Sequence, residues 1–141
     1  MAEDIPQNAV PDEEIHPEVD WHLQALVGLA NNEGMEMGVT LMLSGTVVTG
    51  TLISGKTYFE EFGALFADGF SDMNEEQKAT IRQAMSVPAD LYTPDRASVP
   101  ISFIHLRNAK VRTPSGSMPA DGTLWRGRLT EVSGFFLGSL S

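Results

Sequence analysis

The first hydrophobic pattern along the chain has the period of an α-helix and begins after residue 16. Pro17 is typical of a first helical position, and Glu18 and Asp20 favour the positive end of a helix dipole. Apolar residues then recur on one helical face, at Val19, Leu23, Leu26, Val27 and Ala30. We therefore predict an amphipathic helix from Pro17 to about residues 31–34, with Trp21 and His22 off its apolar face.

Between residues 38 and 53, apolar positions alternate with polar ones, which is the period of a β-strand. Two such runs flank the dipeptide Ser44-Gly45, which favours a tight turn. The pattern predicts a β-hairpin whose register is fixed by that turn. Gly50 lies inside the second run and indicates a sharp bend of the strand.

The helical period returns twice, and it predicts helices at about residues 56–68 and 73–86. The first helix has an unusually aromatic stripe, made of Tyr58, Phe59, Phe62, Leu65, Phe66 and Phe70. Such a stripe either covers an open end of a small barrel or forms an exposed apolar patch for self-association or for docking a partner. Asp72 and Glu75 form a D-x-x-E capping signal before the second helix, and residues 87–100 are expected to be a connecting loop.

The C-terminal third predicts three strands, at about residues 101–112, 122–130 and 132–139. Residues 113–122 are rich in Pro, Gly and Ser and predict a loop between the first two of these strands. The order of elements therefore predicts an α+β fold. We expect a five-stranded antiparallel small β-barrel with an N-terminal helix and a helical insertion, about residues 56–87, after the second strand.

The faces of the last strands suggest which residues are free for contacts. Arg126 and Arg128 point to one side of their strand and Trp125 to the other, because side chains alternate along a strand. We expect Phe103 and His105 to lie on the supporting side together with Trp125.

Phe135 and Phe136 are neighbours in the last strand, so they cannot both face the core, and one is available to another molecule. The candidate interaction surface therefore consists of Tyr58, Phe59, Phe62, Phe66, Arg126, Arg128, Phe135 and Phe136.

Charge is distributed unevenly in this acidic chain, whose net charge is −10. Residues 1–95 carry 17 acidic and 3 basic side chains, whereas residues 96–141 carry 2 acidic and 6 basic ones. We interpret residues 1–16 as a disordered acidic tail and residues 17–141 as a single domain. There is no cysteine, no apolar run near the roughly 20 residues that span a bilayer, and no basic signal segment, so we expect a cytoplasmic protein without a membrane segment.

We find no arrangement of residues that predicts catalysis. His16, His22 and His105 are scattered without metal-ligand spacing, and the glycines fit no nucleotide-binding or nucleophile motif. We therefore predict no enzyme activity, no catalytic residues, no metal and no cofactor.

Two stretches resemble the two-part signature of the Sm-like fold, a small barrel of the SH3-like kind. They are Val39-x-Leu41-x-Leu43-x-Gly45-x-x-Val48-x-Gly50-x-Leu52 and the run from Phe103 to Ala109. In that superfamily, edge strands of neighbouring subunits pair into rings, so the resemblance implies a homo-oligomer. The helical insertion departs from the pattern, as does the absence of most RNA-pocket positions beyond Asn108.

Other blocks look like the gas vesicle accessory proteins of the U type. They are Gly45-x-Val47-Val48-x-Gly50-Thr51-x-Ile53-Ser54-x-Lys56-x-Tyr58-Phe59, Phe103-Ile104-His105-Leu106-x-Asn108-x-Lys110, Trp125-Arg126-Gly127-Arg128 and Val132-x-Gly134-Phe135-Phe136-Leu137-Gly138. This resemblance implies a non-enzymatic, cytoplasmic protein associated with gas vesicles. It would act in vesicle assembly or clustering through self-association and through contact with the vesicle shell or with other gas vesicle proteins.

An alternative hypothesis is an Sm-like RNA-binding protein that uses its basic C-terminal strands. The residues in question are Arg107, Lys110, Arg112, Arg126 and Arg128. The acidic total opposes this hypothesis, because neutralisation of phosphates supplies most non-specific affinity for nucleic acid. A small-ligand barrel is a third hypothesis, for which no group of polar residues indicates a pocket.

Overall fold

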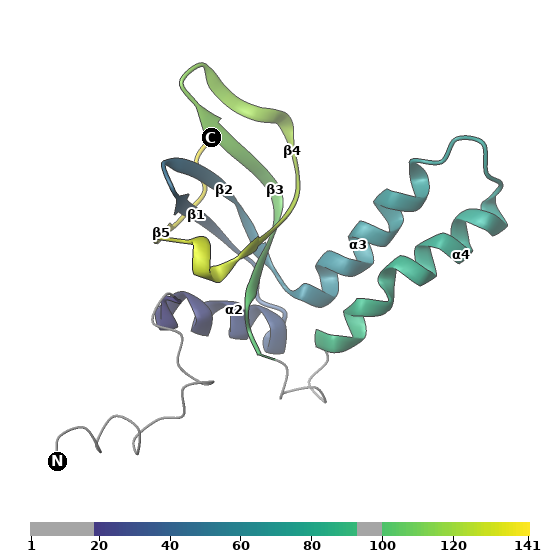
Figure 1. Cartoon of the computed structure of the whole chain (residues 1–141), viewed down its shortest axis with the longest axis horizontal. Helices are drawn as coiled ribbons and strands as arrows, with labels where there is room; N and C mark the ends of the chain where they lie inside the picture. Colours follow the sequence, from purple (N-terminus) through teal and green to yellow (C-terminus); the bar gives the residue numbers. More distant parts are fainter. Residues whose placement is uncertain (1–18, 93–99) are drawn as a thin grey trace, which may run out of the picture.

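A computed structural model describes residues 19–92 and 100–141, and it contains one five-stranded antiparallel sheet, an N-terminal helix and a projecting pair of helices (Figure 1). The predicted acidic tail and Pro17 lie outside the described residues. Helix α2 (Trp21–Glu33) begins after Asp20, whose carboxylate accepts hydrogen bonds from the backbone N–H groups of His22 and Leu23. It ends at Gly34 in the left-handed conformation.

Strands β1 (Met37–Leu43) and β2 (Thr46–Ile53) form the predicted hairpin. Both turn residues have positive φ, 45° at Ser44 and 83° at Gly45, which matches the twist of the flanking strands. The register of β2 against β3 (Phe103–Thr113) shifts between Thr49 and Thr51. A Cβ atom at Gly50 would lie 3.0 Å from the Cα of Ala109, so the predicted irregularity at Gly50 coincides with a close approach of the two backbones.

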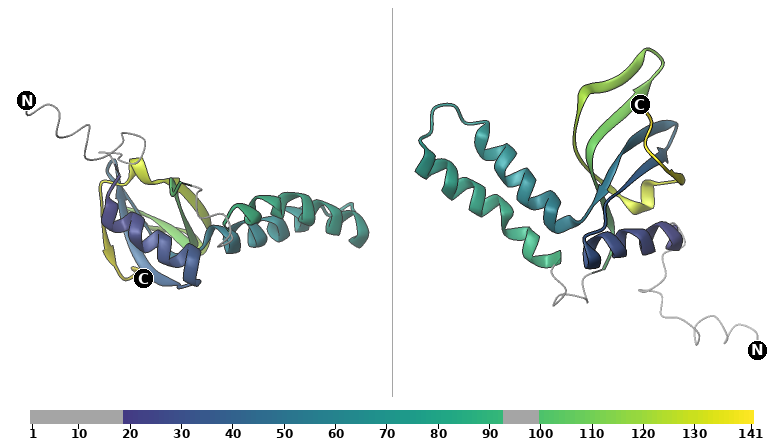
Figure 2. Two further views of the ribbon diagram at one scale, coloured as in Figure 1. Left: turned by 90° about the horizontal axis from the view of Figure 1, so that it is seen from below. Right: turned by 180° about the vertical axis from the view of Figure 1, so that it is seen from behind.

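Helices α3 (Gly55–Asp68) and α4 (Glu75–Ser86) form an antiparallel pair, which we call the arm. Two views show the arm projecting away from the sheet, so it does not close an end of the sheet, which was one of its two expected positions (Figure 2). The capping residues of α4 are Asn74 and Gln77, which form a reciprocal capping box, and not Asp72 and Glu75 as predicted.

Two segments predicted as loops have regular structure. Residues after α4 form a 3₁₀-helix, η2 (Val87–Tyr92), and residues 93–99 of the predicted connection lie outside the described range. Most of the predicted loop 113–122 belongs to strand β4 (Gly116–Arg128), which pairs with β3 through a short turn. A short 3₁₀-helix, η4 (Leu129–Glu131), then leads to β5 (Gly134–Leu137).

The strands are ordered β4-β3-β2-β1-β5, and all neighbouring pairs are antiparallel. β4 and β5 are the two edges and do not pair with each other in the described part of the chain, so the sheet is open and the predicted barrel is not confirmed. The hydrophobic core lies between one face of the sheet and α2, and we call this the inner face. Its buried residues are Leu23, Val27, Ala30, Val39, Leu41, Val48, Leu52, Ile104, Leu106, Ala109, Leu129 and Val132.

Candidate interaction surfaces

His105 lies at the junction between the sheet and the arm, on the face opposite the main core, which we call the outer face. The ring of Tyr58 is 4.6 Å from the imidazole, Tyr92 is 5.6 Å away and Phe59 is 5.8 Å away, measured between ring centroids. His105 is almost completely buried. The first turn of α3 is therefore attached to the outer face through aromatic packing around one histidine.

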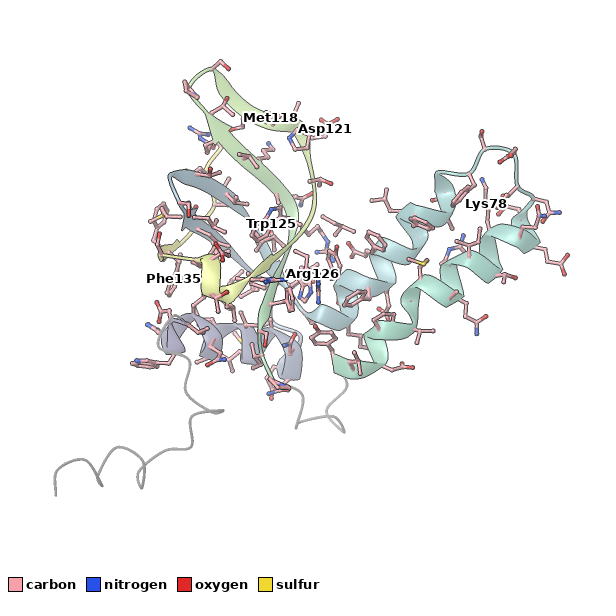
Figure 3. All side chains as sticks on the ribbon, viewed as in Figure 1. Lys78, Met118, Asp121, Trp125, Arg126 and Phe135 are labelled. Atoms are coloured by element: carbon pink, nitrogen blue, oxygen red, sulfur yellow. The ribbon has the colours of Figure 1, made fainter. Side chains whose placement is uncertain are left out.

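Arg126 on β4 completes this junction. Its Nε donates a hydrogen bond of 3.1 Å to Nε2 of His105, and its guanidinium lies 3.6 Å from the ring centroid of Phe103 and 5.5 Å from that of Phe59. Figure 3 shows Arg126 between the sheet and α3. These contacts hold the guanidinium cation over two aromatic rings. Each such cation–π pair contributes about 0.5–2 kcal/mol of attraction.

The hydrogen bond from Arg126 indicates which tautomer of His105 is present. Nε2 is the acceptor, so the proton of the neutral ring is on Nδ1, which has no hydrogen-bond partner among residues 19–92 and 100–141. Burial, and secondarily the charge of Arg126, lower the pKa of His105 from 6.5 to about 3. Burial also raises the pKa of Tyr58, so both rings remain neutral near pH 7.

An aromatic ladder runs outward from this junction along α3 and ends at Phe70, just beyond the helix. Consecutive rings four residues apart, Tyr58–Phe62, Phe62–Phe66 and Phe66–Phe70, have centroids 5.8, 5.9 and 5.4 Å apart. Tyr58 is buried, whereas Phe66 is 41% exposed. The candidate residues predicted on α3 therefore differ in role, since those near the sheet attach the arm and those farther out contribute exposed surface.

Arg107 on β3 forms ion pairs with two carboxylates, Glu61 on α3 and Glu36 just before β1. Both its Nε and its Nη2 donate to the carboxylate of Glu61, and its Nη1 donates to Glu36 over 3.0 Å. These hydrogen bonds raise the pKa of Arg107 despite partial burial. The ion pairs connect the arm, β3 and the segment before β1. The charge of Arg107 is therefore already paired with carboxylates of the same chain.

A groove of about 390 Å³ lies between α3 and β4. Leu65 of α3 and Leu124 of β4 line it, together with the Arg107–Glu61 pair, Asn108 and Gly122. Asn108 and Gly122 both have positive φ, and a Cβ at Gly122 would lie 2.8 Å from the Cα of Asn108. The glycine thus permits the two strands to approach closely at the groove.

The other edge of the sheet carries a second aromatic group. Phe135 is opposite Leu41 of β1 and packs against the core, and its ring meets that of His22 edge to face at 5.7 Å. Trp21, which is 77% exposed, stacks on His22. Phe136 is opposite Thr40 and points to the outer face, where it is 45% exposed. Phe136 is thus the outward member of the Phe135–Phe136 pair.

The strand register corrects the predicted division of faces on β3 and β4. Phe103 is opposite Arg128 and His105 is opposite Arg126, so these four residues share the outer face. Trp125 is opposite Leu106 and packs against the core on the inner face. The prediction that Phe103 and His105 lie with Trp125 was wrong.

The candidate residues fall into two groups at opposite edges of the sheet. Tyr58, Phe59, Phe62, Phe66, Arg126 and Arg128 belong to the arm and β4, and Phe135 and Phe136 belong to β5. Figure 3 places Arg126 and Phe135 on different sides of the sheet. The prediction omitted Leu65, Leu137 and Trp21 from the surface, although the helical stripe already contained Leu65.

The described residues give no indication of a metal site or a membrane helix. Within residues 19–92 and 100–141, no three His, Asp or Glu side chains are grouped as a metal ion would require. None of the helices in this part of the chain is long and apolar enough to cross a membrane.

Comparison with known proteins gives one match. The model of a family described as gas vesicle protein GvpU-like matches residues 20–140, which includes the whole sheet, α3 and α4 and nearly all the residues discussed above. Searches of curated proteins and of solved structures found no match. The chain therefore belongs to the GvpU-like family of gas vesicle proteins.

Proposed function

We propose that this chain is a non-enzymatic accessory protein that acts in the assembly or clustering of gas vesicles, by associating with itself and by contacting the vesicle shell. Membership of the GvpU-like family supports the connection with gas vesicles. The observation that carries the rest is the open sheet. Within the described residues its two edges are unpaired, and both have exposed apolar side chains nearby.

An open sheet edge presents backbone N–H and C=O groups that another strand can pair with. Here the two edges differ, since β4 lies beside the arm and β5 lies beside the aromatic group formed by Trp21, His22 and Phe135. A molecule with two different contact surfaces can bind two neighbours at once. Several weak contacts with a shell then add up, because each bound copy raises the effective concentration of the next.

The alternative of RNA binding receives less support from the arrangement of basic residues. Arg107 is paired with Glu61 and Glu36, and Arg126 is held against Phe103 and His105. Binding of phosphates would have to compete with these partners, so the positive charge available to RNA is smaller than the sequence suggests.

Flotation with purified gas vesicles tests the proposal. Gas-filled vesicles rise during centrifugation, so a protein that contacts their shell is expected in the buoyant layer, in an amount that saturates as its concentration increases. An unrelated acidic protein of similar size is the matched control. If the chain stays in the lower solution at every concentration, as the control should, direct contact with the shell is wrong.

A further inference from the structure

Residues 138–141 continue from β5 and cross the outer face of the sheet toward β3 (Figure 1), and we call them the strap. At its start, the backbone N–H of Gly138 donates to the carbonyl of Gly38 over 2.7 Å, and the hydroxyl of Thr40 donates to the carbonyl of Gly138 over 2.8 Å. A Cβ atom at Gly38 would lie 3.0 Å from the backbone nitrogen of Ser139, so the strap lies directly on β1. The absence of a side chain at Gly38 makes this crossing possible.

The rest of the strap is held by side chains of β2 and β3. The N–H of Leu140 donates to Oγ1 of Thr49 over 2.7 Å, and Nη1 of Arg112 donates to the carbonyl of Ser141. In these four hydrogen bonds, the group that the strap contributes is always a backbone group. Every peptide has such groups, so the outer face can hold an extended segment without recognising most of its side chains.

The surface beneath the strap is polar, and the strap buries little apolar surface on it. Thr40 and Thr49 are buried, and their hydroxyl oxygens lie 3.0 Å apart. All four strap residues are exposed, including Leu140 with 38% of its surface. Water can replace the hydrogen bonds of the strap, and little apolar burial holds the strap in place. A segment that is bound in this way can be displaced by another peptide.

A polar cavity of about 250 Å³ lies beside the strap, lined by Ser139 and Leu140 and by side chains of the sheet. Lys110 of β3 and Asp121 of β4 also line it. Within the described residues, Lys110 forms no ion pair. Arg112 is two residues farther along β3, so two cations and one carboxylate surround this end of the strap. The balance of charge favours a negative group here.

We propose that the path of the strap across the outer face is a binding site for an extended segment of a partner protein that carries an acidic side chain. We call this path the track, and it consists of Gly38, Thr40, Thr49, Lys110 and Arg112. The segment places a small residue over Gly38, as the strap does with Ser139, and a carboxylate near Lys110 and Arg112. The strap occupies the track when no partner is bound.

This arrangement makes the strap a competitor of the partner. A segment can bind only while the strap is away, so its apparent affinity is reduced by the fraction of time that the track is free. The track crosses the face of the sheet and uses neither edge. The inference is therefore independent of the self-association and the shell contact proposed above, and failure of either proposal leaves the other standing.

Two substitutions at Leu140 test the competition. Leu140→Pro removes the N–H that donates to Thr49 and leaves the track intact, whereas Leu140→Ala keeps this N–H. The probe is the peptide Gly-Ser-Leu-Asp, blocked at both ends and added to the full chain in an NMR shift titration, which detects weak binding. It should bind Leu140→Pro roughly tenfold more tightly than the wild type, because the strap has lost a hydrogen bond. Leu140→Ala should bind like the wild type, and the shifts should centre on Thr40, Thr49 and Arg112.

A change of charge tests the expected chemistry of the partner. The peptide Gly-Ser-Leu-Lys should bind Leu140→Pro several-fold more weakly than Gly-Ser-Leu-Asp does. Adding Lys110→Gln to Leu140→Pro should weaken binding of the acidic peptide roughly threefold, as expected for a partly exposed ion pair. If the acidic and basic peptides bind equally, the track does not select a carboxylate and the proposed partner is wrong.

A measurement on the wild type needs no substitution and therefore does not depend on how the variants fold. Saturating acidic peptide should accelerate amide hydrogen exchange at Leu140, because the displaced strap loses its hydrogen bond to Thr49. Circular dichroism verifies that each variant is folded. The inference is overturned if the acidic peptide binds neither the wild type nor Leu140→Pro, if it binds both equally, or if exchange at Leu140 is unchanged by saturating peptide.

Discussion

At the scale of single residues, His105 and Arg126 connect the sheet to the arm. The imidazole is buried among Tyr58, Phe59 and Tyr92, and it accepts a hydrogen bond from Arg126. Because Nδ1 has no hydrogen-bond partner in the part of the chain that the structure describes, protonation would add a positive charge beside Arg126 without a compensating acceptor there. The junction therefore favours the neutral form of His105.

This protonation behaviour predicts how stability depends on pH. The pKa of His105 is about 3 in the folded chain and near 6.5 when unfolded, so between these values the unfolded state binds a proton that the folded state does not. The stabilising contribution is complete above pH 6.5 and decreases as the pH falls toward 3. Between pH 7 and pH 5, the wild type should lose about 2 kcal/mol more free energy of unfolding in urea titrations than His105→Gln. An equal loss in both proteins would mean that His105 titrates normally and is not held neutral.

The prediction from sequence identified His105 as a strand residue but assigned it to the wrong face together with Trp125. Alternation within one strand is a local property, so the opposite directions of Trp125 and Arg126 could be predicted. Which residues of β3 share a face with them depends on the register between strands, and that register shifts between Leu106 and Val111. The positive φ of Asn108 lies within this irregularity and has no clear signal in the sequence.

At the scale of elements, the arm is held together by a close approach of its two helices. A Cβ at Gly63 of α3 would lie 2.4 Å from Oγ of Ser86 and 2.8 Å from the backbone oxygen of Arg82, both on α4. Helix α4 has no buried residue, so its position depends strongly on this contact. The Arg107–Glu61 ion pair fixes the base of α3 to β3.

Gly63→Ala tests this dependence. The added methyl group must displace backbone of α4, so we expect a cost of about 1–3 kcal/mol that exceeds the gain of about 1 kcal/mol from higher helix propensity. Amide hydrogen exchange of α4 should become faster, while exchange in β1–β3 stays unchanged. Gly69→Ala is the control, because a Cβ there meets no atom closer than 3.4 Å and φ is −73°. Unchanged protection of α4 in Gly63→Ala would show that the helices do not pack as described.

Elements with strong local signals were predicted well, and those determined by tertiary position were not. The β1–β2 hairpin and the extent of α3 followed from periodicity and turn residues. Residues 113–122 were predicted as a loop because of their prolines and glycines, yet most of them form β4. A proline is tolerated there because β4 is an edge strand, where a missing N–H donor need not break a ladder hydrogen bond.

At the scale of the whole molecule, an open sheet separates the two surfaces that we propose for contacts. The arm and β4 form one edge, and β5 with Trp21 and His22 forms the other. This separation could not be predicted from sequence, because the barrel expected from the strand pattern would have brought the two edges together. An open sheet with unlike edges is suited to linking copies in series, and linked copies bind a repetitive surface more tightly than single ones.

Flotation of the wild type and Phe136→Asp with purified gas vesicles, over a series of protein concentrations, tests most directly whether self-association drives contact with the shell. The wild type is expected to reach half-saturation of the buoyant layer at a concentration at least roughly tenfold lower than Phe136→Asp does, because an assembled protein binds through many copies at once. Phe136→Asp places a charge on the exposed β5 edge, whereas Leu29→Asp places one on α2 and should match the wild type. Equal half-saturation of the wild type and Phe136→Asp, or failure of the wild type to float at all, would contradict the claim that self-association drives contact with vesicles.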